Sequence, residues 1–142
     1  MLISTKGRYA LRILLDLYSL EKTQSEEIPL KTLSETEGLS EKYLESIIGS
    51  LSKAKIVKGT RGKGGGYKLT REASQITIKD ILLATEKTLA PVACMAKSEL
   101  CPKNDICKTL PLWCNIEHLL SSYLSTFTLQ DLAEGKIEKL YD

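Results

Sequence analysis

The sequence predicts a mainly helical fold with one small β-hairpin, and three observations lead to this. Most of the chain places apolar residues three or four positions apart, which is the spacing of amphipathic helices. One glycine-rich segment, KIVKGTRGKGGGYKLT, instead alternates β-branched or aromatic residues with polar ones, which predicts two strands joined by a turn. A last apolar stretch follows Pro111 and is long enough for an extended C-terminal helix.

The first half is expected to form three helices. Thr5 is expected to cap a helix that runs through about Leu20. Pro29 should open a short helix that ends at Gly38, and Ser40 should cap the helix that follows. The apolar stripe of that third helix is formed by Leu44, Ile47, Ile48 and Leu51. The second and third helices meet across a tight turn, which is the layout of a helix-turn-helix.

The second half begins with the hairpin, which follows the helix-turn-helix directly and would therefore be a wing. Thr77, with Asp80 three residues later, predicts a capped helix that fades around Lys87. Thr128 and Asp131 predict a second, short capped helix. One side of the long helix between them would be formed by Ile116, Leu119, Leu120, Tyr123, Leu124 and Phe127.

These elements divide the 142 residues into three expected segments. Residues 1–88 would form a winged helix-turn-helix domain, and residues 89–109 a cysteine-rich, cofactor-sensing loop. Residues 110–142 would form a long dimerisation helix and a short C-terminal helix. The stretch from 89 to 108 has no sustained periodicity, which favours a loop.

Charge is concentrated around the hairpin. Residues 52–71 contain seven basic side chains and no acidic ones, although the whole chain carries only +2. A basic block on a nearly neutral chain indicates a polyanion site, the alternative being a solvated face on a purely structural hairpin. The helix after the turn would enter the DNA major groove, lysines would contact phosphates, and a wing arginine would reach the minor groove. The candidate DNA contacts are Ser40, Lys42, Tyr43, Glu45, Ser46, Lys53, Arg61 and Lys63.

Other classes of function lack their motifs. The glycines do not fit G-x-G-x-x-G, because Tyr67 stands where the third glycine should be. His118 is the only histidine, and no nucleophile is paired with a base, so no enzyme is predicted. No stretch has the length of a membrane span and no signal-peptide pattern is present, so a cytoplasmic protein without membrane contact is expected.

All four cysteines lie between residues 94 and 114, in the order Cys94-x6-Cys101-x5-Cys107-x6-Cys114. The absence of C-x-x-C disfavours thioredoxin-like redox chemistry and a zinc ribbon. Wide spacing on an unpatterned loop suits an iron–sulfur cluster, whose thiolate ligands lie several ångströms apart. A thiol switch and buried structural thiols are the alternatives.

Three stretches, STKGRYALRILLDL, LSEKYLESIIGSLSKAKIVKGTRGKGGGYKL and TLQDLAEG, resemble the family of winged-helix bacterial regulators that contains IscR, NsrR and CymR. The resemblance extends over nearly the whole chain. It implies a dimeric DNA-binding protein and DNA contacts at Ser40, Tyr43, Glu45, Ser46 and Arg61. It also implies a cluster held by Cys94, Cys101 and Cys107. CymR-like members lack these cysteines, which argues against that branch.

The resemblance does not supply a fourth ligand. Leu110 occupies the position of the histidine ligand of the iron–sulfur-biogenesis regulators, and Arg8 the position of the acidic ligand of the nitric-oxide sensors. A further subtype places Glu and His where this chain has Arg8 and Arg12. Cys114 is the natural replacement, provided that the long helix begins after Cys107. A small molecule or water, Asp105 and His118 are the other candidates.

The sequence thus predicts a homodimeric repressor that binds double-stranded DNA. It would sense iron–sulfur or redox status through a cluster, with 2Fe–2S favoured over 4Fe–4S. The alternative is a winged-helix regulator that uses its cysteines as a thiol redox switch or a zinc site.

Overall fold

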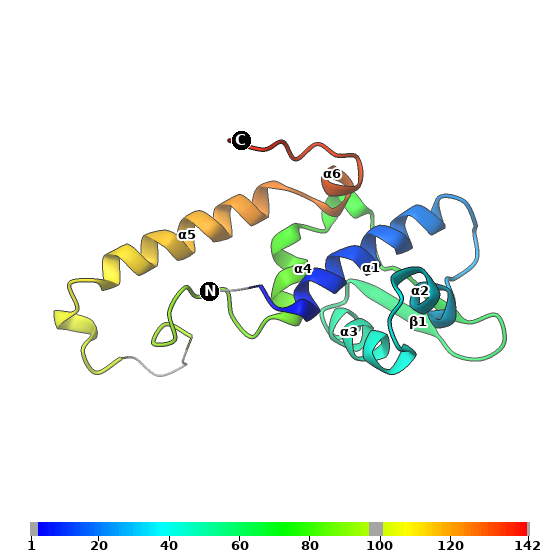
Figure 1. The fold of residues 1–142 in the computed structure, drawn as a ribbon, viewed down its shortest axis with the longest axis horizontal. Coiled ribbons are helices and arrows are strands. Elements are labelled where there is room, and N and C mark those ends of the chain that lie inside the picture. The colour runs from blue at the N-terminus through cyan, green and yellow to red at the C-terminus, as the bar shows by residue number, and fades with distance from the viewer. Residues whose placement is uncertain (1–2, 97–100, 142) are drawn as a thin grey trace.

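The fold is described here from a computed structural model, for residues 3–96 and 101–141 (Figure 1). The first three helices are α1 (Thr5–Glu21), α2 (Leu30–Glu37) and α3 (Glu41–Lys53). Gly38 ends α2 in the left-handed conformation, with φ +65°, as expected of a glycine at this position. The Ser40 hydroxyl accepts a hydrogen bond from the Tyr43 N–H at 3.3 Å and caps α3. The predicted helix-turn-helix is therefore confirmed.

The cap of α1 is Ser4, so the prediction of Thr5 was wrong by one position. Ser4 has extended backbone angles, and its Oγ accepts a hydrogen bond from the Gly7 N–H at 3.0 Å. The carboxylate of Glu86 reinforces this end by accepting from the backbone N–H and the hydroxyl of Ser4, at 3.0 and 2.7 Å. A side chain on Gly7 would collide with that carboxylate, which explains the glycine in the first turn of α1.

The wing consists of β1 (Val57–Thr60) and β2 (Gly66–Leu69), which pair antiparallel with Val57 opposite Leu69. Ile28 adds a one-residue bridge on the other side of β2, through two backbone hydrogen bonds with Tyr67 of 2.9 and 2.8 Å. A Cβ on Gly66 would run into the backbone of Ile28, so only glycine permits this close approach.

Two short helices share one arrangement at their N-termini. They are α4 (Ile78–Thr85) and α6 (Leu129–Ala133), capped by Thr77 with Asp80 and by Thr128 with Asp131. Both predicted capping boxes are confirmed, each with the hydroxyl and the carboxylate bonded to the other residue's N–H. The two caps pair with each other through a bridge between Thr77 and Thr128. This pairing fastens α6 to α4, and Leu129 is fully buried in the core.

One hydrophobic core lies between the first four helices. It contains Ile13, Leu14 and Leu17 from α1, Leu33 from α2, Leu44, Ile47, Ile48 and Leu51 from α3, and Ile78, Ile81 and Leu82 from α4. The predicted apolar stripe of α3 is thus entirely buried. A short 3₁₀ helix, η1 (Ala73–Gln75), connects the wing to α4.

Helix α5 (Leu110–Thr126) extends away from this body as an arm (Figure 1). It follows a second 3₁₀ turn, η2 (Asn104–Ile106), and Pro111 lies in its first turn. Its apolar residues fall on two faces. Leu120 and Leu124 pack against the core, whereas Leu119 and Tyr123 are 68% and 41% exposed. No helix in the described residues is long and apolar enough to cross a membrane.

Candidate nucleic-acid interface and cysteine loop

The N-terminal half of α3 presents three of the predicted DNA contacts outward. Lys42, Glu45 and Ser46 are exposed on successive turns of the helix. Ser40 is also exposed, but its hydroxyl already serves as the helix cap. Tyr43 is half-buried, and its ring lies edge-on to that of Tyr9 with the centroids 6.2 Å apart. Ser40 and Tyr43 therefore have structural roles whether or not they contact DNA.

The tip of the wing carries two exposed cations, Arg61 and Lys63. The turn is built on Gly62 and Gly64, whose φ angles of +101° and +78° are ones that side-chain-bearing residues rarely adopt. The Gly65 N–H closes the turn by donating to the Gly62 carbonyl at 3.0 Å. The glycines of the wing therefore shape the loop that displays the basic side chains, and they form no phosphate-binding motif.

Two acidic side chains hold the wing against the body. Glu21, at the end of α1, accepts a hydrogen bond from the Leu69 N–H at 2.6 Å. Burial raises the pKa of Glu21, although this bond and nearby Lys68 act in the opposite direction. Glu27 accepts from the Thr60 hydroxyl at 2.8 Å. The two carboxylates thus attach the wing, Glu21 at its base and Glu27 nearer its tip.

A groove of about 550 Å³ separates the wing from the helix-turn-helix. Its walls include Leu30 at the start of α2, Ser52 at the end of α3, and Arg61 on the wing. Lys53, the last residue of α3, is exposed next to Ser52. The candidate contacts are thus distributed over α3 and the wing tip, with a concave surface between the two elements.

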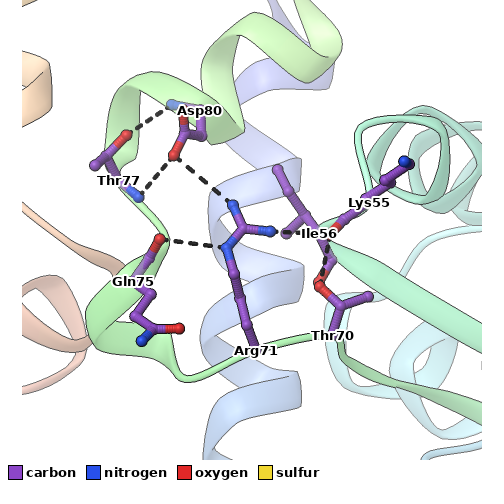
Figure 2. Close-up of polar contacts among 7 residues, drawn as sticks. All are labelled: Lys55, Ile56, Thr70, Arg71, Gln75, Thr77 and Asp80. Carbon is purple, nitrogen blue, oxygen red and sulfur yellow. Dashed lines mark hydrogen bonds and ion pairs between the residues drawn. The ribbon is translucent and has the colours of Figure 1, made fainter.

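Arg71 differs from the other members of the basic block. Figure 2 shows its guanidinium group turned toward the protein, between Gln75, Asp80 and the backbone of Lys55. Lys55 has a φ of +58° and is the one described residue other than glycine with a positive φ. Neither feature was predicted, because an alanine–lysine step before a strand has no local signal for this conformation. Arg71 is thus part of the fold rather than of an open basic surface.

An acidic pair between α1 and α2 was also missed. Asp16 on α1 and Glu37 on α2 face each other, and the Arg12 Nε lies 2.9 Å from a Glu37 carboxylate oxygen. Burial raises the pKa of Asp16 to about 6, helped by the hydrogen bond and the negative charge of Glu37 and opposed by Arg12. Acidic residues facing each other across two helices leave no pattern in a sequence.

The four cysteines are free thiols in the described structure. Cys94 and Cys114 are exposed, and Cys101 and Cys107 are half-buried. Within residues 3–96 and 101–141, no three His, Cys, Asp or Glu side chains lie close enough together to hold a metal ion. Cys94, Cys101 and Cys107 lie outside α-helices and strands, so gathering them would break neither a helix nor a sheet.

Cys107 differs chemically from the other three thiols. Its sulfur lies 3.4 Å from the Thr109 hydroxyl. That hydrogen bond, followed by bonds from the Thr109 and Leu110 backbone and the charge of Lys103, lowers the pKa of Cys107. A thiol with a lowered pKa is more often in the thiolate form, which is both the metal ligand and the nucleophile.

Cys114 lies in the second turn of α5, and the helix begins after Cys107, as ligation by Cys114 would require. It lines a cleft with Glu117 and His118 from its own helix and Lys79 and Lys87 from α4 and the segment after it. Cys114 thus lies on a polar side of α5, together with Glu117 and His118. The structure does not bring Cys114 together with the three loop cysteines in a set of metal ligands.

The fold and the basic wing define the class of the protein, that of the winged helix-turn-helix regulators. The chain belongs to the Rrf2 family, described as iron-dependent transcriptional regulators, whose pattern it matches over residues 3–135. It is 36% identical over 132 residues to the protein rrf2 of Nitratidesulfovibrio vulgaris, covering 93% of this chain and 87% of that one. It is 35% identical over 136 residues to the regulator IscR of Yersinia enterocolitica, covering 96% and 81%.

Solved structures agree with this assignment. CymR of B. subtilis, the global cysteine regulator, superposes with a TM-score of 0.73 at 36% identity, covering 94% of this chain and 97% of that one. IscR of T. potens gives the same TM-score at 31% identity, covering 100% and 93%. The predicted fold class and family are confirmed. These relatives are transcriptional regulators and not enzymes. The protein is accordingly a transcriptional regulator of this family.

Proposed function

We propose that the protein represses transcription by binding an operator with α3 and the wing together. The carrying observation is that Lys42, Glu45 and Ser46 are exposed on α3 and that Arg61 and Lys63 are exposed on the wing. A groove lined by Arg61 of the wing and Ser52 of α3 lies between the two elements. Residues at the start of such a helix read base edges in the major groove, and a wing arginine suits the narrow minor groove. Lys53 would add a phosphate contact from the end of α3. Ser40 and Tyr43 would orient the reading helix at its N-terminus.

The functional unit in this proposal is a homodimer. Ile116, Leu119 and Tyr123 of α5 form one wall of an apolar groove, and the tail at residues 137–141 forms the other. An exposed apolar helix face typically marks a protein interface, and a two-fold dimer presents two reading helices to a two-fold operator. A second copy of the chain, packed along α5, therefore suits both observations. The dimer would act in the cytoplasm, where it has access to chromosomal DNA.

The sensing group in this proposal is an iron–sulfur cluster, with 2Fe–2S favoured over 4Fe–4S. Cys94, Cys101 and Cys107 would hold it. The donor set fits, because all three are free thiols on one irregular loop and thiolate is the usual ligand of such clusters. Cys114 is proposed as the fourth ligand, since the α5 helix begins at Leu110 and leaves a connecting segment after Cys107. When bound, the cluster would supply a redox- and iron-sensitive centre in the loop before the N-terminal end of α5.

One observation supports a second candidate, a regulator that senses through thiol chemistry or zinc. The hydrogen bond with the Thr109 hydroxyl, together with backbone hydrogen bonds at Thr109 and Leu110, lowers the pKa of Cys107. A lower pKa would make this thiol more reactive without any iron. Both candidates predict that changes at the cysteine loop alter DNA binding.

Anaerobic purification separates the two candidates. Under the cluster proposal, the protein is coloured and contains iron and acid-labile sulfide in equal amounts, and Cys101→Ala removes both. Cys114→Ala should weaken or change the cluster spectrum. A colourless wild-type protein that contains zinc, or no metal, would contradict the cluster proposal. An unchanged cluster in Cys114→Ala would contradict only the assignment of the fourth ligand.

DNA binding is tested separately by selecting duplexes from a random-sequence library with the wild-type protein. The proposal predicts enrichment of a two-fold symmetric sequence. It also predicts that Arg61→Ala lowers affinity for it by about tenfold, since a well-placed contact is worth on the order of 1–3 kcal/mol. Glu72→Ala, a change at an exposed position just before η1, is the control. Equal effects of the two substitutions would contradict the placement of the wing on DNA.

A further inference from the structure

The reading helix and the wing are joined by a very short turn. Helix α3 ends at Lys53 and β1 begins at Val57, so the conformation of three residues sets the direction of the wing. The middle residue, Lys55, has the left-handed φ of +58°, which is unfavourable for a residue with a side chain. Something else in the fold must therefore hold this turn in place.

The carbonyl oxygen of Lys55 accepts two hydrogen bonds from the residues that directly follow β2. The Arg71 Nη1 donates at 2.9 Å, and the Thr70 hydroxyl donates at 2.6 Å. The neighbouring Ile56 carbonyl accepts from the Thr70 N–H at 3.0 Å. Figure 2 shows Thr70 and Arg71 beside the backbone of Lys55, with the Lys55 side chain directed away from the guanidinium group. The turn before β1 is thus held from the segment that follows β2.

Arg71 also connects this turn to α4. Its Nε donates to the Gln75 carbonyl at 3.3 Å, and its Nη2 lies 3.9 Å from a carboxylate oxygen of Asp80 (Figure 2). Asp80 is itself fixed by the capping box with Thr77. A planar guanidinium can reach three partners in fixed directions, which the ammonium of a lysine cannot do. The side chain is about one third exposed, with its donors directed at the protein.

We propose that Arg71 is a positioning residue, which sets the angle between the wing and the reading helix and does not itself contact DNA. This inference rests on the proposed DNA interface. It assigns to Arg71 a role different from that of the other basic residues of the hairpin: Arg61 and Lys63 bind the polyanion, whereas Arg71 holds them where they can reach it.

The first test needs no DNA. Arg71→Lys keeps the positive charge but loses the planar set of guanidinium donors. In this variant, amide hydrogen exchange at Thr70 and along β1 should be at least tenfold faster than in the wild-type protein. Adding Lys55→Gly removes the steric cost of the positive φ at this position and should restore much of the protection. Lys68→Arg, on β2, is the matched control and should leave exchange unchanged. Equal exchange in wild type and Arg71→Lys would overturn the inference.

The second test is a double-mutant cycle on the duplex that the wild-type protein enriches from a random-sequence library. Arg71→Lys alone should lower affinity on the order of tenfold, the scale of a lost charged hydrogen bond. In a protein that already carries Arg61→Ala and Lys63→Ala, the same substitution should have almost no further effect. Lys53→Ala, on the end of α3, should lower affinity equally in both backgrounds.

The outcomes of this cycle are distinguishable. If Arg71→Lys lowers affinity by the same factor with and without the wing cations, Arg71 acts directly on DNA and the inference is overturned. If Arg61→Ala and Lys63→Ala do not change affinity, the proposed wing interface fails, and the role of Arg71 in DNA binding fails with it. Should no duplex be enriched, the proposed function fails, and the exchange measurement alone then decides whether Arg71 holds the wing.

Discussion

Asp16 and Glu37 place two acidic groups against each other where α1 packs on α2. Burial, and then Glu37, raises the pKa of Asp16 to about 6 from the ordinary value of 3.8. The folded protein therefore holds a proton on Asp16 that the unfolded chain releases at lower pH. It follows that this site favours the folded state most below about pH 4, and that the benefit disappears as the pH rises to about 6.

Replacing Asp16 by asparagine is expected to remove this pH dependence. The amide cannot ionise, so Asp16→Asn should be more stable than wild type near pH 7.5, with the difference shrinking toward pH 4. Urea unfolding at the two pH values measures this. Glu35→Gln, on the exposed side of α2, is a matched control and should show no such trend. A stability difference between Asp16→Asn and wild type that is constant with pH would contradict the assignment.

Single residues of the site could be predicted where their signal is local in the sequence. Ser40, Thr77 and Thr128 were identified as caps because a cap is a local signal, a short polar side chain just before an apolar repeat. Ser4 was missed in favour of its neighbour Thr5, because both have hydroxyls and only the fold shows which one has extended backbone angles. Arg71 was counted as a surface charge, because its partners come from three separate segments of the chain.

At the scale of elements, the paired caps of α4 and α6 join the end of the arm to the body. Each hydroxyl accepts a backbone N–H within its own cap, and Thr77 and Thr128 also pair with each other. The sequence predicted each cap but not their pairing, since about fifty residues separate them and no local pattern links them.

Thr77→Ala should therefore destabilise the fold by about 1–2 kcal/mol, the upper part of the range for losing an N-cap. Urea unfolding measures the change. Thr36→Ala is the control, because Thr36 is exposed and its hydroxyl bonds only to the Thr32 carbonyl in the preceding turn, so its loss should cost little. Equal stability of the two variants would contradict the role given to this cap.

Helix α5 shows where sequence periodicity reaches its limit. The pattern predicted one apolar side, whereas the structure divides it into Leu120 and Leu124 against the core and Leu119 and Tyr123 in an exposed groove. Periodicity identifies apolar residues but cannot say which of them the body of the molecule covers and which stay exposed.

At the scale of the whole molecule, the proposed dimer makes the exposed face of α5 a testable interface. The wild-type protein should have twice the 15.8 kDa mass of the chain in sedimentation, and Leu119→Glu should shift it to the monomer. A charge buried in an apolar interface without a partner is strongly unfavourable. Ser125→Glu adds the same charge on another exposed position of α5 and should remain dimeric. A monomeric wild type, or a dimeric Leu119→Glu, would contradict this interface.

The cysteine loop connects α4 in the body to the α5 arm, so its state concerns the molecule as a whole. The lowered pKa of Cys107 was not predicted, but the sequence did group Cys94, Cys101 and Cys107 as three thiols on one irregular loop. Their assembly around a cluster stays a prediction, because a ligand set forms only with the group that it binds.

The central claim is that the state of the cysteine loop controls DNA binding by α3 and the wing. The most direct measurement compares the affinity of the cluster-loaded and metal-free proteins for the same selected duplex at the same salt concentration. We expect a difference of at least about tenfold, which is a coupling free energy of about 1.4 kcal/mol, and we expect no such difference in Cys101→Ala. Equal affinities of the two forms would contradict it.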